Sequence, residues 1–160
     1  EQALKALDRM RRHEGRTLER DLLARLKEID GRLRVVRLRL PAIVQERQAR
    51  LQERVNRLLE SAGGGKDGVD QSRVAQEVAL LADRSDVSEE LTRLDSHLDQ
   101  FRNFLHKSEP VGRSLDFLLQ EMNREVNTIG SKVGDTVVTQ EIVALKAEFE
   151  KIREQVQNVE

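Results

Sequence analysis

Hydrophobic residues recur along the chain at alternating steps of four and three, which is the period of an amphipathic α-helix. The first such stripe extends from Leu18 to Leu58 and predicts a helix over about Ala3 to Leu59. Pro41 lies inside this segment, and because proline lacks the N–H and clashes with the preceding turn, we expect a kink or a break there. Residues 1–60 are therefore predicted to form a long helical arm, kinked near Pro41.

A glycine-rich stretch at 61–69, which begins SAGGGKDG, interrupts the helical pattern. Consecutive glycines hold a helix poorly, so this stretch is predicted to link the arm to a C-terminal four-helix region at 70–160. A short helix is expected at about 70–82. Asp86 has the position of an N-cap for the next helix, whose apolar stripe ends at Leu105.

Two more helices complete the predicted architecture. Pro110 is suited to the first turn of one helix, and the stretch Gly130 to Gly134 ends it. The last helix is expected at about 136–158, again with apolar steps of four and three. Because no useful strand-like alternation occurs, the fold class is all-α. Long antiparallel helices should pack as an extended helical bundle with coiled-coil-like stripes.

Composition narrows the classes of function. Charged residues make up 36% of the chain but its net charge is −1, so it has no global positive field for nucleic acid. The absence of cysteine excludes disulfides and thiolate metal sites, and no apolar run is long enough for a membrane span. No P-loop, dinucleotide-binding glycine pattern or HExxH motif is present. The chain starts inside a helical pattern without Met, which we interpret as a fragment or a processed chain.

Arginine is frequent between Arg9 and Arg57, and this local excess has two interpretations. The residues concerned include Arg32, Arg34, Arg37, Arg39, Arg47 and Arg50. They could follow a phosphate backbone. The more ordinary interpretation is a solvated helix face with interleaved Glu, and for any single arginine the pattern favours it.

One polar stripe on the helix after Pro110 is unusual in its residue types. Its members are Arg113, Asp116, Gln120, Asn123, Arg124, Asn127 and Ser131. A solvated face is usually built from Lys and Glu, whereas Asn and Asp are poor helix formers whose side chains compete for backbone hydrogen bonds. A helix that aligns amides, carboxylates and guanidinium groups is therefore expected to bind something with them.

Carboxylates on this helix and on the last one could hold a divalent metal ion. They are Asp116, Glu121, Glu125, Glu150 and Glu154. Mg²⁺ and Mn²⁺ prefer such oxygen ligands, and nearby arginines could contact phosphate, which suits phosphodiester hydrolysis. The alternative is a set of inter-helix salt bridges, which spacing alone favours. His97 could be a general acid or base, although a single helical histidine is more often merely exposed or hydrogen-bonded.

Long segments of the chain resemble the C-terminal region of the YicC/YloC family of bacterial endoribonucleases. They are VDQSRVAQEVALLADRSDVSEELTRLDSHLDQF at 69–101, VGRSLDFLLQEMNREVNTIGSK at 111–132 and ALKAEFEKIREQVQNVE at 144–160, with HEGRTLERDLLARL at 13–26 upstream. The resemblance implies a bacterial, cytoplasmic protein that cleaves RNA, depends on a divalent metal (Mn or Mg) and assembles into a homo-oligomer, a hexamer. It also implies a further N-terminal domain.

The resemblance carries over motif positions without separating catalytic roles from packing roles. These positions are Glu77, Asp83, Arg84, Glu89, Glu90, His97, Arg113, Asp116, Glu121, Asn123, Arg124, Glu125, Asn127 and Lys132. As a hypothesis we assign catalysis to Glu121, Glu125, Asp116 and His97. RNA binding is assigned to Arg113, Asn123, Arg124, Asn127, Lys132 and Arg153, and metal binding to Glu121, Glu125, Glu150 and Glu154.

Two alternatives to an enzyme stay open at this point. The chain could be a non-catalytic RNA-binding or oligomerisation module that recruits RNA-decay proteins. It could also be a coiled-coil dimerisation element alone. A cleavage assay with and without Mn²⁺ separates the first alternative from a nuclease, and RNA binding separates the second.

Overall fold

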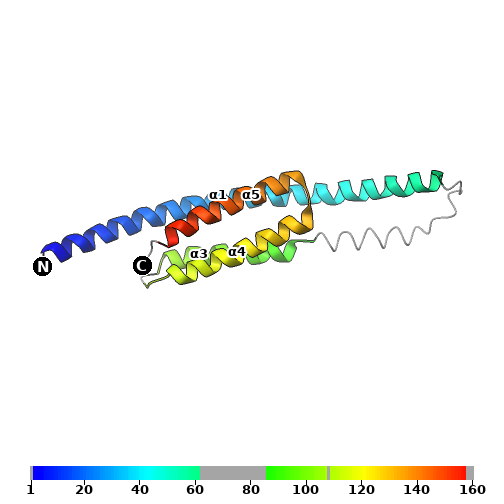
Figure 1. The fold of residues 1–160 in the computed structure, drawn as a ribbon. Helices are drawn as coiled ribbons and strands as arrows, with labels where there is room; N and C mark the ends of the chain where they lie inside the picture. The colour runs from blue at the N-terminus through cyan, green and yellow to red at the C-terminus, as the bar shows by residue number, and fades with distance from the viewer. Residues whose placement is uncertain (1, 62–85, 108, 158–160) are drawn as a thin grey trace.

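A computed structural model describes residues 2–61, 86–107 and 109–157. Within these ranges the chain forms four helices and no strand. They are α1 (Gln2–Ser61), α3 (Ser88–Leu105), α4 (Gly112–Val133) and α5 (Thr136–Val156). Figure 1 shows α3, α4 and α5 lying alongside the middle of α1, whose two ends extend beyond them. The predicted all-α helical bundle is confirmed.

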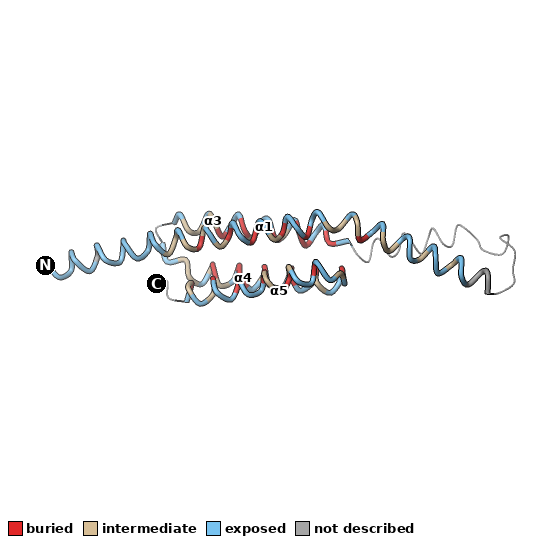
Figure 2. Tube along the Cα trace, turned by 90° about the horizontal axis from the view of Figure 1, so that it is seen from above, coloured by how far each residue is buried: buried red, intermediate tan, exposed pale blue. Residues whose placement is uncertain are grey.

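The middle of α1 supplies one side of the hydrophobic core. Its buried residues, which we call the core seam, are Leu22, Leu26, Ile29, Leu33, Val36 and Ile43. Together with the half-buried Leu40, they alternate at steps of four and three, so they share one face of the helix. Burying each such side chain stabilises the fold by about 1.5–3 kcal/mol. Figure 2 shows this burial confined to the central part of α1, while its N-terminal end is exposed.

The helix continues through Pro41, so the break that the sequence allowed there does not occur, while the kink stays a prediction. Proline removes one backbone hydrogen bond and costs about 3 kcal/mol inside a helix. Pro41 is itself exposed, and the core seam holds the helix in place on both sides of it, through Val36 and Ile43. Tertiary packing therefore overrides the local preference of one residue.

Ion pairs flank the core seam of α1 on both sides. Towards α5 the pairs are Arg25 with Glu148, Arg32 with Glu141 and Arg39 with Asp135, at 3.1, 3.2 and 3.0 Å. Towards α3 they are Asp30 with Arg102 and Arg37 with Asp95, at 2.5 and 2.6 Å. Within each set the α1 members are seven residues apart. Their partners on the other helix have lower residue numbers as the residue number along α1 increases. Both sets therefore fix an antiparallel register, as flanking charges do in coiled coils.

The structure shifts two of the predicted helix starts by one or two residues. Val87, not Asp86, is the N-cap of α3, although the Asp86 carboxylate accepts a hydrogen bond from the Ser88 backbone N–H at 2.9 Å. α4 begins at Gly112 rather than at Pro110. The turn to α5 is built as the sequence allows: Gly134 adopts a left-handed conformation with φ of 56°.

Asp135 caps α5 and also ties it to α1. Its side chain accepts hydrogen bonds from the backbone N–H groups of Val137 and Val138. Arg39 hydrogen-bonds the same carboxylate, which lowers the pKa of Asp135, and the two backbone N–H groups act in the same direction. One carboxylate thus caps the N-terminus of α5 and also pairs this helix with α1.

Two predictions of the domain organisation lie outside the described residues. They are the glycine-rich linker beyond Ser61 and the short helix at about 70–82. The division into an arm and a C-terminal region stays a prediction, but the core seam places residues 22–43 in the same core as α3, α4 and α5. Among the described residues, no helix is long and apolar enough to cross a membrane.

Two glycines of contrasting environment test the backbone account. A Cβ added at Gly31 meets no atom within 4 Å, so Gly31→Ala should raise the free energy of unfolding by about 0.5–1 kcal/mol through helix propensity. Gly134→Ala should lower it by about 1 kcal/mol or more, because its φ of 56° strains an L-residue. Urea denaturation measures both changes. Equal effects of the two substitutions would contradict the assigned conformations.

Candidate functional site

α4 packs against α3 on one side and α5 on the other, so its polar residues lie on three different surfaces around the buried face. Its buried face carries Leu115, Leu118, Leu119, Met122, Val126 and Ile129. The apolar stripe predicted for this helix is therefore confirmed. The polar residues divide into an edge that meets α3, an edge that meets α5 and an exposed outer face, and the sequence-predicted site residues are distributed over all three.

The α3 edge begins with a lysine that joins two helices. The Lys132 ammonium group donates to Glu90 Oε1 at 2.7 Å and to the Asp86 backbone carbonyl at 3.1 Å. Glu90 is buried, with 4% of its surface exposed, while Lys132 is exposed on the other side of the contact. The position predicted to bind RNA thus also holds a buried carboxylate.

Arg93 and Glu125 form the second contact of the α3 edge. The guanidinium group donates from Nε and Nη2 to the two carboxylate oxygens of Glu125, at 2.8 and 3.1 Å. Its Nη1 also donates to Glu89 at 2.6 Å. Such a two-pronged arrangement is the strongest geometry for this pair. Glu125, which we expected to be catalytic, is buried and bonded through both oxygens.

Electrostatics explain why these groups stay charged inside a partly buried contact. Burial pushes the pKa of Glu90 upwards, but the Lys132 hydrogen bond and the charges of Lys132 and Arg93 outweigh it, so the pKa lies below its ordinary value. The hydrogen bond to Glu125 raises the pKa of Arg93. The α3 edge is therefore an ion network in which each buried acid has a cation.

His97 and Glu121 lie one helical turn further along the same edge. In antiparallel helices a step of four residues in each chain direction leads from Arg93 and Glu125 to this pair. Both side chains are half-buried. The buried Nδ1 of His97 has no hydrogen-bond partner among the described residues, and Glu121 forms no ion pair there. These two titratable groups are the ones that the ion network leaves uncommitted.

The α5 edge brings Asp116 and Arg153 together, as the shared core of the two helices predicted. Arg153 Nε donates to Asp116 Oδ1 at 3.2 Å, and Gln120 donates to the other oxygen, Oδ2, at 2.7 Å. Asn123 is half-buried on the same side of α4. Asp116, a predicted catalytic residue, is thus held by one of the predicted RNA-binding residues.

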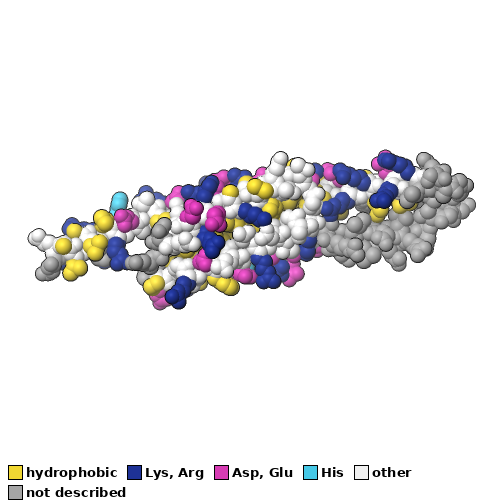
Figure 3. Space-filling view, in the orientation of Figure 1, with side chains coloured by type: hydrophobic (Ala, Val, Ile, Leu, Met, Phe, Trp, Pro, Cys, Tyr) yellow, Lys and Arg dark blue, Asp and Glu magenta, His cyan; other side chains and the backbone are white. Residues whose placement is uncertain are grey.

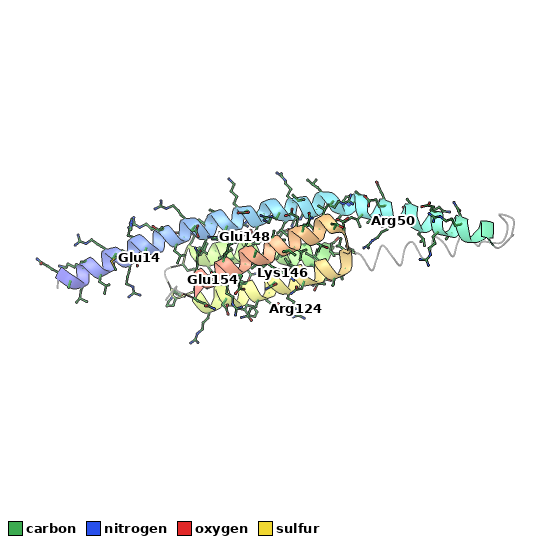
Figure 4. All side chains as sticks on the ribbon, turned by 45° about the horizontal axis from the view of Figure 1, so that its top comes forward. Glu14, Arg50, Arg124, Lys146, Glu148 and Glu154 are labelled. Atoms are coloured by element: carbon green, nitrogen blue, oxygen red, sulfur yellow. The ribbon has the colours of Figure 1, made fainter. Side chains whose placement is uncertain are left out.

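The outer face of α4 carries cations without ion-pair partners among the described residues. Arg113, Arg124 and Asn127 are exposed, and Lys146 is exposed on the neighbouring α5. Figure 4 labels Arg124 on α4 and Lys146 on α5. Figure 3 shows that positive and negative side chains are interspersed on this side of the bundle. The face can therefore contact an anion locally without a continuous positive field.

The carboxylates predicted to bind metal are not gathered in one place. Glu121 and Glu125 belong to the α3 edge of α4, whereas Glu150 and Glu154 are exposed on α5. Across residues 2–61, 86–107 and 109–157, no three Asp, Glu or His side chains form a group that could hold a metal ion. The residues of this bundle alone therefore do not fit the expected Mn²⁺ or Mg²⁺ site.

Sequence reasoning missed the roles of Arg93 and Glu90. Glu90 pairs with Lys132 and Arg93 with Glu125 across two helices, and this pairing depends on the register between the helices rather than on a spacing within either one. Three carried-over positions, Glu77, Asp83 and Arg84, lie outside the described residues.

The sequence that forms this all-α bundle belongs to a recognisable class of protein. Residues 36–160 match the sequence model of the family described as "Endoribonuclease YicC-like, C-terminal". The match covers most of the chain, and the chain belongs to this family.

Two curated relatives show how much of a whole protein the chain represents. It is 41% identical over 160 residues to "Probable endoribonuclease YicC" of Clostridioides difficile (strain 630), covering 100% of this chain and 53% of the relative. It is 42% identical over 151 residues to the protein of the same name from Haemophilus influenzae (strain ATCC 51907 / DSM 11121 / KW20 / Rd), covering 94% and 50%. The chain thus spans about half the length of these relatives.

The buried carboxylate of Glu90 should make the stability of the fold depend on pH. Because the pKa of Glu90 is lowered from 4.5 in the folded chain, its contribution to stability is present above that value and is lost as pH falls through the folded pKa. Glu90→Gln should therefore flatten the decline in unfolding free energy between about pH 5 and pH 3. At neutral pH it should cost about 1 kcal/mol.

Glu89 provides the matched control, since its side chain is 79% exposed beside the same arginine. Glu89→Gln should leave both quantities nearly unchanged. Chemical denaturation at several pH values measures the two variants. An identical pH profile for Glu90→Gln and the unsubstituted chain would show that the Lys132 contact does not form.

Proposed function

We propose that the protein is an endoribonuclease, and that this chain supplies its C-terminal helical part. The observation that supports the proposal is the family match over residues 36–160, together with two relatives that are named probable endoribonucleases. The activity and the RNA substrate are proposed for the whole protein, because the chain covers only half of those relatives. A cytoplasmic location and a homo-oligomer, a hexamer, belong to the same proposal.

The α3 edge of α4 is the place where we put the chemistry. Breaking an RNA phosphodiester needs a base that activates the attacking hydroxyl or water and an acid that protonates the leaving oxygen. His97 and Glu121 are suited to these two roles because neither is consumed by the neighbouring ion pairs. Arg93 lies one turn away and Lys132 about three turns away, and each is already paired with a buried carboxylate of this edge.

Glu125 and Asp116 take different roles in this proposal from those the sequence suggested. Glu125 is buried and bonded to Arg93 through both oxygens, so it positions the arginine beside His97 and Glu121. Asp116 likewise holds Arg153 on the α5 edge. Arg113, Arg124 and Asn127 remain the exposed groups of α4 that could contact the RNA backbone.

The divalent metal stays a proposal that the assay must address separately. Ligands for Mn²⁺ or Mg²⁺ would have to come partly from outside this bundle, since its described carboxylates do not form a ligand set. Cleavage is therefore to be measured with Mn²⁺, with Mg²⁺ and with a chelator.

The experiment is an RNA cleavage assay with the full-length protein. His97→Ala and Glu121→Gln should each reduce the rate of internal cleavage by about a hundredfold or more, which is the usual contribution of a general acid or base. The fold should be unchanged, because neither side chain forms an ion pair in the described part of the chain. Circular dichroism and thermal unfolding check this.

Two substitutions serve as controls of matched chemistry. His106→Ala removes an exposed histidine at the other end of α3, and Glu53→Gln removes an exposed carboxylate of α1. Both should cleave at the native rate. Native rates for His97→Ala and Glu121→Gln would reject the site. RNA binding without cleavage in every metal condition would reject the enzyme and favour the module that recruits RNA-decay proteins.

A further inference from the structure

The side of α1 that faces away from the core carries a regular pattern of its own. We call it the outer stripe, and its members are Arg20, Ala24, Lys27, Gly31, Arg34 and Leu38. They alternate at steps of four and three, which keeps them on one face of the helix. All six are exposed, while the core seam lies about half a turn away around the same helix.

The outer stripe contains three cations and no carboxylate. A solvated helix face normally interleaves Glu with Lys and Arg, because opposite charges four residues apart stabilise the helix. On α1 the three carboxylates beside the stripe between residues 21 and 30 are engaged on the flanks. The pairs are Asp21 with Arg25, Glu28 with Arg32 and Asp30 with Arg102.

The positive charge of the stripe is therefore not neutralised by neighbouring acids. Arg20, Lys27 and Arg34 have no ion-pair partner among the described residues. Of the arginines noted in the sequence, Arg32, Arg37 and Arg39 are used in contacts with other helices. The structure thus separates arginines that hold the bundle from cations that face outwards.

Two of the positions between the cations carry small residues that project little from the helix. Ala24 follows Arg20, and Gly31 lies between Lys27 and Arg34. A Cβ at Gly31 meets no atom within 4 Å, so packing inside the chain does not require a glycine there. Glycine is also a poor helix former. The small residues Ala24 and Gly31 leave the cations of the stripe accessible from solvent.

We propose that the outer stripe binds the phosphate backbone of an RNA that runs along α1. Seven residues of helix rise by about 10 Å, so the three cations form an evenly spaced row. Such a row can bind phosphates along the strand independently of base sequence, with release of counterions. Base stacking is not needed, and the chain has no Trp or Tyr to provide it.

This inference rests on the proposed function and deepens it. It assigns a contact to the substrate on α1, away from the α3 edge of α4 where we place the chemistry. The stripe should therefore affect RNA affinity and its salt dependence, and should leave the cleavage rate at saturating RNA unchanged. An acidic protein surface is the competing ligand, and the experiment includes it as an outcome.

The first test changes a single position in two ways in the full-length protein. Gly31→Glu places a carboxylate within one turn of both Lys27 and Arg34, while Gly31→Ala adds only a methyl group in open space. We expect Gly31→Glu to raise the Kd for RNA about fivefold or more at low salt. Gly31→Ala should bind as the unsubstituted protein does. Equal affinities for the two variants would overturn the proposal.

The second test measures how many phosphates the stripe contacts. The combined variant Arg20→Gln, Lys27→Gln and Arg34→Gln should reduce the slope of log K against log salt by about 2, at roughly 0.7 per contact with single-stranded RNA. The control removes three exposed cations elsewhere, through Arg9→Gln, Arg57→Gln and Lys107→Gln. Its slope should hardly change. Equal slopes for the two triple variants would overturn the proposal.

The remaining outcomes separate this inference from the proposed function. Normal binding by the stripe variants, in a protein that cleaves RNA, rejects the stripe alone. Binding that depends on the stripe, in a protein that cleaves nothing, supports the stripe and rejects the enzyme. Loss of an acidic protein partner with unchanged RNA affinity rejects RNA as the ligand. A full-length protein that neither binds nor cleaves RNA rejects both proposals.

Discussion

Packing of the core seam of α1 against the other three helices is the constraint on which the rest of the structure depends. Once Leu22, Ile29 and Leu33 face inwards, every other position of α1 has a fixed direction. Arginines and acids next to the seam come within reach of α3 and α5, and those opposite it face solvent. The arrangement of charge on the bundle is thus a consequence of where the aliphatic residues lie.

Much of the architecture could be predicted from the sequence because helical periodicity is a local property. The apolar stripe of α4 and the turn at Gly134 follow from spacing and glycine chemistry within a few residues. Pro41 shows the limit of local reasoning: its effect depends on whether packing holds the helix on both sides, which Val36 and Ile43 provide. Propensity was outweighed there by contacts between distant segments.

The candidate site was harder to predict because it depends on register between helices. Asp116 and Arg153 were expected to border one groove, and they do meet. Glu125 and Lys132 looked available for chemistry, but each is paired across to α3, with Arg93 and Glu90. Nothing in the local spacing of α4 reveals which acid will find a cation on another helix. For this reason the polar residues of α4 include some that pair with neighbouring helices and others that form no ion pair in the described part of the chain.

Sorting the charged residues by partner connects the fold to the proposed function. Ion pairs along α1 set the antiparallel register, and the pairs of the α3 edge hold α4 in place. His97 and Glu121 on one side, and the outer stripe on another, are the groups without ion pairs that we propose for RNA. The family match assigns the chain to the YicC-like C-terminal family, while the distribution of unpaired charge indicates which surfaces of this half of the protein are suited to the proposed RNA substrate.

Native-state hydrogen exchange on the 160-residue chain tests the central claim most directly. If the core seam belongs to the bundle, amides of α1 between residues 22 and 43 should open with the same free energy as those of α4 and α5. Amides of residues 2–17, where all the described side chains are exposed, should exchange much faster. Rapid exchange throughout residues 22–43, with α4 still protected, would show an independent arm and contradict the account.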